Sequence, residues 1–150
     1  MRGAELGGRY YVTGGLQENF KSVTTCISVD LVSGAEASIS CPSQHRLGGD
    51  LLAIDGCLFL IGGSARGPED AKRAPTHAIE MYEPETDHWS TLAARVPFDD
   101  PAQLRALASG RDILLYSAQR ADATLGVALL DPEAMRLGRS HVLEVRDPRL

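Results

Sequence analysis

The chain has 150 residues, 43% of them hydrophobic and 23% charged, which is enough to fold as one ordinary domain instead of staying disordered. Its net charge of −5 gives no general attraction to phosphate backbones or anionic lipid, so nucleic acid and membranes are not expected as partners. No apolar run approaches the roughly 20 residues that span a bilayer, and no signal-type apolar core follows residues 1–5.

The first predicted elements are short strands near the start of the sequence. Residues 2–6 are just long enough for one strand, and residues 9–13 form a second that ends at Gly14-Gly15. After a loop, residues 26–29 are predicted to form another strand, which ends at Asp30. The same order of strand, glycine pair, loop, strand and acidic turn recurs further along the chain.

The central segment has the clearest pattern. Its apolar runs at residues 51–54 and 57–61 are too short for helices, and Asp55-Gly56 between them is typical of a two-residue hairpin turn. Because a strand buried on both faces shows no polar alternation, these runs predict inner strands of a sheet stacked between neighbouring sheets. Gly62-Gly63 then allows positive φ and close backbone approach where the chain leaves the inner strand.

The outer part of the central segment follows a polar loop. Residues 78–82 are predicted to extend the sheet outward, the acidic turn at residues 83–85 follows, and Trp89 opens the outermost strand. Tyr82 and Trp89 occupy recurrent positions, so we interpret both rings as core packing and not as a platform for stacking a sugar.

The downstream segment repeats this layout in weaker form. Residues 112–116 and 126–130 are predicted strands, Ser117-Ala118 replaces the glycine pair, and an acidic turn follows at residues 131–133. The segments recur about every 48 residues, and four short strands in about 45 residues are the pattern of a propeller blade. The sequence therefore predicts an all-β fold of four-stranded antiparallel blades, with boundaries near residues 2–41, 50–95 and 102–145.

The repeat spacing, the Gly62-Gly63 pair, Tyr82 with Trp89, and the acidic turn around Pro84 resemble the kelch repeat. The resemblance implies a β-propeller that binds proteins, such as the substrate-recognition propeller of a cullin-type ubiquitin ligase adaptor. The BTB or F-box domain of such an adaptor would lie outside this sequence. The resemblance also leaves an alternative, because some kelch-like propellers are enzymes that act on sugars or depend on copper.

Three blades pose a physical problem, because propellers typically close about 4 to 8 blades into a ring. An open arc leaves two sheet faces bare. Covering roughly 500 Å² of apolar surface on one face is worth about 12 kcal/mol, which is comparable to the stability of a whole domain. We therefore expect the arc to belong to a larger propeller, or two copies to pair into a six-bladed ring. A shortened product without independent function is the remaining alternative.

The long loops of the predicted blades should share one face, because every second connection of an antiparallel meander lies on the same side. Long polar loops on a rigid scaffold are where recognition usually resides, so we predict that a protein or peptide binds this face. Arginines suit the recognition of its carboxylate or phosphate groups. The predicted binding residues are Gln17, Asn19, Arg46, Arg66, Glu69, Lys72, Arg73, Asp100 and Gln103.

No catalytic motif is found in the sequence. The histidines, at positions 45, 77, 88 and 141, have no carboxylate or nucleophile at a catalytic spacing. Residues 62–67 follow a predicted strand but lack the G-x-G-x-x-G pattern and the Lys-Ser/Thr ending of phosphate-binding loops. We therefore predict no enzymatic activity and no cofactor.

The cysteines Cys26, Cys41 and Cys57 are odd in number, and Cys57 lies in an apolar run where a reduced thiol behaves as a small hydrophobe. We therefore expect unrelated, reduced cysteines and a cytoplasmic protein. Cys41 and His45 share one loop, but a structural zinc site takes about four protein ligands and no fourth candidate is near. No metal is predicted.

Overall fold

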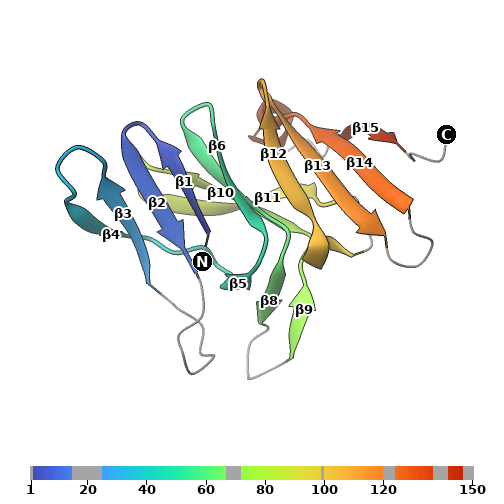
Figure 1. Ribbon diagram of the computed structural model, residues 1–150, viewed down its shortest axis with the longest axis horizontal. Coiled ribbons are helices and arrows are strands. Elements are labelled where there is room, and N and C mark those ends of the chain that lie inside the picture. Colours follow the sequence, from blue (N-terminus) through green and yellow to red (C-terminus); the bar gives the residue numbers. More distant parts are fainter. Residues whose placement is uncertain are drawn as a thin grey trace.

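The computed structural model describes residues 2–14, 25–66, 72–98, 100–119, 124–136 and 142–146, with the backbone alone at residues 66, 118, 119, 124–126, 136 and 142–146. Three four-stranded antiparallel sheets follow one another along the chain and stand side by side (Figure 1). We number these sheets as blades 1 to 3. The all-β prediction and the prediction of four-stranded antiparallel blades are confirmed.

The strands of each blade run in chain order from the inner to the outer edge. Blade 1 contains β1 (Arg2–Leu6), β2 (Arg9–Thr13), β3 (Cys26–Asp30) and β4 (Glu36–Ile39). Blade 2 contains β6 (Asp50–Ile54), β7 (Cys57–Ile61), β10 (Ala78–Glu83) and β11 (His88–Arg95). Blade 3 contains β12 (Arg105–Ser109), β13 (Asp112–Gln119), β14 (Thr124–Leu130) and β15 (Val142–Arg146).

Blade 2 is covered on both faces, which explains the uninterrupted apolar run of β7. Every residue of β7 is buried, and successive side chains point to opposite faces of the sheet. Leu58 and Leu60 pack in a core with Tyr11 of blade 1. Phe59 and Ile61 pack in a second core, which includes residues of blade 3, of the segment before β12 and of the helix after β14. These residues are Leu104, Ala106, Ile113, Leu115, Ala128, Leu130 and Met135.

Gly62 and Gly63 adopt φ of +72° and +81°, as predicted from the sequence. A Cβ on Gly63 would lie 2.7 Å from the carbonyl oxygen of Leu47, and one on Gly62 would lie 3.0 Å from that of Pro101. The amide of Gly63 donates to the Pro101 oxygen at 3.1 Å. The glycine pair is therefore where the connections from blade 1 and toward blade 3 both press against blade 2.

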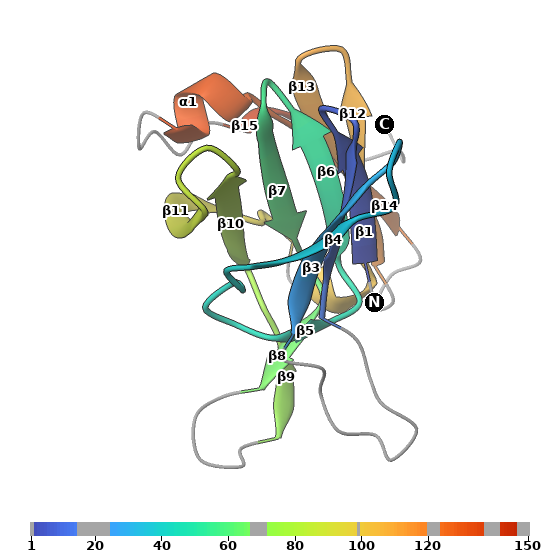
Figure 2. The ribbon, with the colours of Figure 1, turned by 90° about the vertical axis from the view of Figure 1, so that its left-hand side faces the viewer.

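The loop predicted at residues 64–76 contains a β-hairpin instead. Its strands are β8 (Ser64–Arg66) and β9 (Arg73–Pro75), and β8 also pairs with β5 (Arg46–Leu47) to form a small three-stranded sheet. This sheet projects beyond the blades, at the end opposite the tight turns that join β6 to β7 and β12 to β13 (Figure 2). Strands this short carry too few apolar residues to show a period in the sequence.

Blade 3 departs from the predicted layout at two places. Ser117-Ala118, predicted to replace the glycine pair, continues β13 and pairs with residues of β14. The predicted acidic turn after β14 becomes the helix α1 (Pro132–Arg136), because the Asp131 carboxylate accepts the Glu133 amide at 2.9 Å. The helix buries Met135 completely in the core between blades 2 and 3.

Replacing Gly63 by alanine should destabilise the fold through backbone strain and through a clash with Leu47. We expect Gly63→Ala to lower the free energy of unfolding by more than about 2 kcal/mol. Gly34→Ala is the matched control, because Gly34 has φ of +72° but no atom within 4 Å of the position that a Cβ would take. That variant should lose only about 1 kcal/mol. Equal losses in denaturant titrations would mean that the close approach contributes nothing.

Candidate functional site

Basic residues gather at the projecting hairpin. The register places Arg66 opposite Arg73, and Lys72, immediately before β9, is exposed. The structure thus brings together three of the residues predicted to bind a partner, on the element that extends furthest from the blades (Figure 2). Glu69 lies outside the described residues.

Two other predicted residues lie at the short 3-10 helix η1 (Pro101–Gln103), which leads into blade 3: Asp100 precedes it and Gln103 is its last residue. Asp100 caps this helix by accepting the Ala102 amide at 3.0 Å, and Gln103 is exposed. Because the Pro101 oxygen accepts the Gly63 amide, η1 lies next to the base of the projecting hairpin. Gln17 and Asn19 lie outside the described residues.

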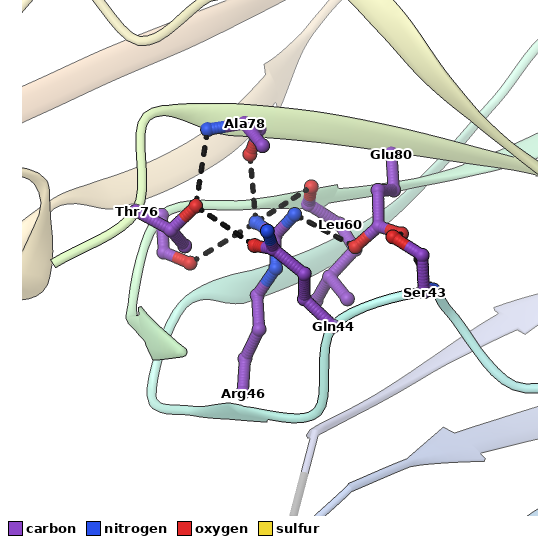
Figure 3. A network of polar contacts seen from close by, with 8 residues as sticks. Ser43, Gln44, Arg46, Leu60, Thr76, Ala78 and Glu80 are labelled. Atoms are coloured by element: carbon purple, nitrogen blue, oxygen red, sulfur yellow. Dashed lines mark hydrogen bonds and ion pairs between the residues drawn. The ribbon is translucent and has the colours of Figure 1, made fainter. Parts of the chain in front are cut away.

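Arg46 is buried instead of presented to a partner, because it forms an ion pair with Glu80 at 2.8 Å (Figure 3). Both side chains are 1% exposed. Its other terminal nitrogen lies 2.7 Å from the Ala78 oxygen, 3.2 Å from that of Gly62 and 3.4 Å from that of Leu60. Burial lowers the pKa of Arg46, and the charge of Glu80 opposes that shift. The prediction that Arg46 belongs to the binding surface does not agree with the burial of its side chain.

The segment before Arg46 joins the same network. The backbone amide and hydroxyl of Ser43 both donate to Glu80, each at 2.7 Å. The hydroxyl of Thr76 donates to Gln44 at 3.1 Å and accepts from the Ala78 amide at 3.2 Å (Figure 3). These contacts fix the connection between blades 1 and 2 onto β10, and with it the strand β5 that supports the projecting hairpin.

A second cluster holds the outer edge of blade 2 to the same connection. Tyr82 donates to Asp87 at 2.8 Å, Ser40 donates to Asp87 from its amide at 2.8 Å, and the Trp89 indole donates to the Ser40 oxygen at 2.9 Å. The rings of Tyr82 and Trp89 lie 5.1 Å apart and are buried. Hydrogen bonds from the Ser40 amide and the Tyr82 hydroxyl lower the pKa of Asp87.

Cys26 and Cys41 form a disulfide bond with an Sγ–Sγ distance of 2.06 Å. The prediction of unrelated, reduced cysteines is therefore wrong for this pair, because the fold brings β3 and the connection after β4 together. Cys57 is buried in β7, as predicted. Disulfides persist mainly in oxidising compartments, so the cysteines no longer support a cytoplasmic location.

A charged cluster at the inner edge was missed in the sequence. Asp50, at the start of β6, accepts from the Arg105 side chain at 3.0 Å and from the Ala106 amide at 2.8 Å. It also lies 3.7 Å from Arg2 of β1. Asp50 thus links the innermost strands of all three blades. Arg2, Asp50 and Arg105 each begin an innermost strand. A charged residue at the same position of each repeat is the sequence signal that could have predicted this cluster.

The opposite end of blade 2 carries a shallow acidic cleft of about 180 Å³. Asp55, Glu83 and Glu85 line it. In the described part of the chain, no three histidine, cysteine or carboxylate side chains gather to hold a metal ion. Nor does any helix described there have the length and apolar content to cross a bilayer.

Stacked four-stranded sheets joined in this order define a β-propeller scaffold. Residues 45–94 match the family model of the Kelch motif, so the kelch resemblance is confirmed. The chain is similar in fold to the solved structure of YjhT, a kelch-type β-propeller, with a TM-score of 0.72 and 15% sequence identity. The match covers 89% of this chain and 48% of YjhT, so the chain spans about half of that structure. No curated protein matches the sequence.

Removing Arg46 should destabilise the fold, because the buried Glu80 carboxylate would lose its ion-pair partner. We expect Arg46→Met to cost about 3–5 kcal/mol in the free energy of unfolding. Adding Glu80→Met to this variant should recover part of that loss, since the double variant buries no unpaired charge. Denaturant titration of both variants measures this coupling. A fully stable Arg46→Met protein would show that the side chain is not a structural anchor.

Asp87 should make stability depend on pH in the acid range. Because its folded-state pKa is lowered, Asp87 stabilises the fold above its ordinary value of 3.8 and loses that contribution as the pH falls through the lower folded-state pKa. Asp87→Asn should therefore be less stable than the original protein at pH 7, with the difference shrinking toward pH ~3. Asparagine tolerates the positive φ of 48° at this position. A difference that stays constant across this range in denaturant titrations would argue against the carboxylate's role.

Proposed function

We propose that this chain is a protein-interaction module that binds an acidic peptide segment of a partner through the projecting hairpin. The proposal is supported by the register of β8 and β9, which sets Arg66 opposite Arg73 beside the exposed Lys72. Arginine donors recognise carboxylate or phosphate groups with defined geometry. Asp100 and Gln103, near the base of the hairpin, belong to the same proposed surface, as do Gln17, Asn19 and Glu69.

The buried network beneath the hairpin suits this role. A binding surface needs a base that does not yield when a partner docks, because ordering a mobile segment reduces affinity. Arg46 supplies such a base, since its guanidinium fastens β5 to the carbonyl groups of Leu60, Gly62 and Ala78. Arg46 therefore supports the proposed surface from below and is not a contact for the partner.

The kelch resemblance leads to a narrower proposal, namely the substrate-recognition propeller of a cullin-type ubiquitin ligase adaptor. In that role the chain recruits a protein substrate and performs no catalytic step itself. The domain that binds the cullin would be supplied outside this sequence. A second interaction, self-association through the outer faces of blades 1 and 3, is proposed alongside partner binding and uses surfaces away from the hairpin.

Reversing the charge of the hairpin tests the proposed binding surface. The double variant Arg66→Glu/Arg73→Glu should lose at least tenfold in affinity for proteins captured by the original chain, measured by biolayer interferometry after circular dichroism has verified the fold. Arg111→Glu is the matched control, because Arg111 is 79% exposed at the opposite end of the blades. Unchanged binding of every captured protein by the double variant would show that the hairpin is passive.

A further inference from the structure

The outer faces of blades 1 and 3 are opposite faces of the repeated sheet. In β7, Leu58 and Leu60 face blade 1, whereas Phe59 and Ile61 face blade 3. The neighbouring blades keep this order, because Tyr11 of β2 and Leu115 of β13 are both turned toward blade 2. The side chains that alternate with Tyr11 and Leu115 therefore point away from blade 2, on the two outer faces.

Both outer faces are mainly apolar on their two middle strands, whereas their edge strands add the polar residues Glu5, Glu36, Ser38, Arg105 and Ser109. On blade 1, the side chains of β2 and β3 that alternate with buried ones are Tyr10, Val12, Ile27 and Val29. On blade 3, the corresponding side chains of β12, β13 and β14 are Leu107, Leu114, Tyr116, Val127 and Leu129. Tyr10 is 42% exposed and Leu107 is 46% exposed, while their strand neighbours Tyr11 and Ala106 are 6% and 2% exposed. The centre of each outer face therefore has the composition of an inter-blade face without the blade that would cover it.

We propose that the outer face of blade 3 packs against the outer face of blade 1 of a second copy, so that two chains close a six-bladed ring head to tail. This specifies the surfaces of the self-association proposed above. The inference rests on the direction in which each face points. The outer face of blade 3 corresponds to the face that blade 2 turns toward blade 3. The outer face of blade 1 corresponds to the face that blade 2 turns toward blade 1. The two outer faces are thus suited to each other and not to themselves.

A second copy is favoured as the occupant by the size of the arc. Three blades and three blades give six, which is within the roughly 4 to 8 blades of closed propellers. This chain also covers 48% of the kelch-type propeller YjhT, so two copies supply about the extent of that one structure. A twofold ring uses both outer faces of each copy and leaves neither in water.

Charges at the inner edge give this junction a distinctive salt dependence. Arg2 begins β1 and Arg105 begins β12, and both side chains are partly exposed, at 41% and 53%. When β12 of one copy stands beside β1 of the other, as β6 stands beside β12, these two arginines become neighbours. Like charges repel less at higher ionic strength, so association should strengthen as salt is added.

Sedimentation of the full chain tests the ring directly. The original protein should sediment as a concentration-dependent dimer of twice 16.1 kDa, with a larger dimer fraction in about 0.5 M than in about 0.05 M sodium chloride. Tyr10→Glu and Leu107→Glu, each on a different outer face, should reduce the dimer fraction at least tenfold. Val32→Glu is the matched control, because Val32 is 97% exposed in the turn between β3 and β4.

Mixing the two face variants distinguishes head-to-tail pairing from pairing of identical faces. The Tyr10→Glu protein retains an intact blade 3 face, and the Leu107→Glu protein retains an intact blade 1 face. A mixture should therefore regain one original junction and recover part of the dimer that neither variant forms alone. Circular dichroism of each variant verifies that the blades remain folded.

Several results would overturn the proposal. A folded, concentration-independent monomer of 16.1 kDa would contradict the pairing itself. Loss of the dimer in only one face variant, or no recovery on mixing, would contradict the head-to-tail arrangement. The Arg66→Glu/Arg73→Glu variant should still form the dimer, so loss of partner binding and loss of ring closure are measured separately.

Discussion

The structure depends on sheets that must be covered on both faces. A lone four-stranded sheet of this composition would expose one apolar side chain for each one that it buries, because strand residues alternate between its faces. Blade 2 meets the requirement by packing Leu58 and Leu60 toward blade 1 and Phe59 and Ile61 toward blade 3. The glycine pair and the buried ion pair serve the same end, because they hold the connecting segments between the blades against blade 2.

The connection between blades 1 and 2 is held at three places, next to the inner, middle and outer strands of blade 2. Asp50 joins the innermost strands of the three blades, Arg46 fastens β5 to β7 and β10, and the Ser40 region binds the outer turn through Asp87 and Trp89. Contacts at different radii resist rotation of one sheet against the next better than contacts at a single radius. The projecting hairpin therefore stands on a base that is fixed relative to two blades.

The sequence was most informative where local pattern and burial agree. Local residue types were enough to predict three features: the buried run of β7, the Asp55-Gly56 turn, and the conformation of Gly62 and Gly63. Arg46 was misassigned, because a charged residue in a loop is ordinarily exposed and its partner Glu80 is distant in the sequence. The pairing of Cys26 with Cys41 likewise depends on the path of the chain around β4, which composition does not contain. The hairpin of β8 and β9 was missed because it is stabilised by β5, another non-local element.

The disulfide helps to hold β4 in place, which the side chains of this strand do only weakly. Glu36, Ala37 and Ser38 are exposed, so this strand contributes little apolar contact to blade 1. Its neighbour β3 is joined to the segment just beyond Ile39 by the bond between Cys26 and Cys41. Under reducing conditions, the backbone ladder between β3 and β4 and the contacts of Ser40 with Asp87 and Trp89 would still hold this peripheral strand. Bare strand edges recruit other chains, so the covalent link adds protection against the new sheet edge that β3 would present if β4 frayed.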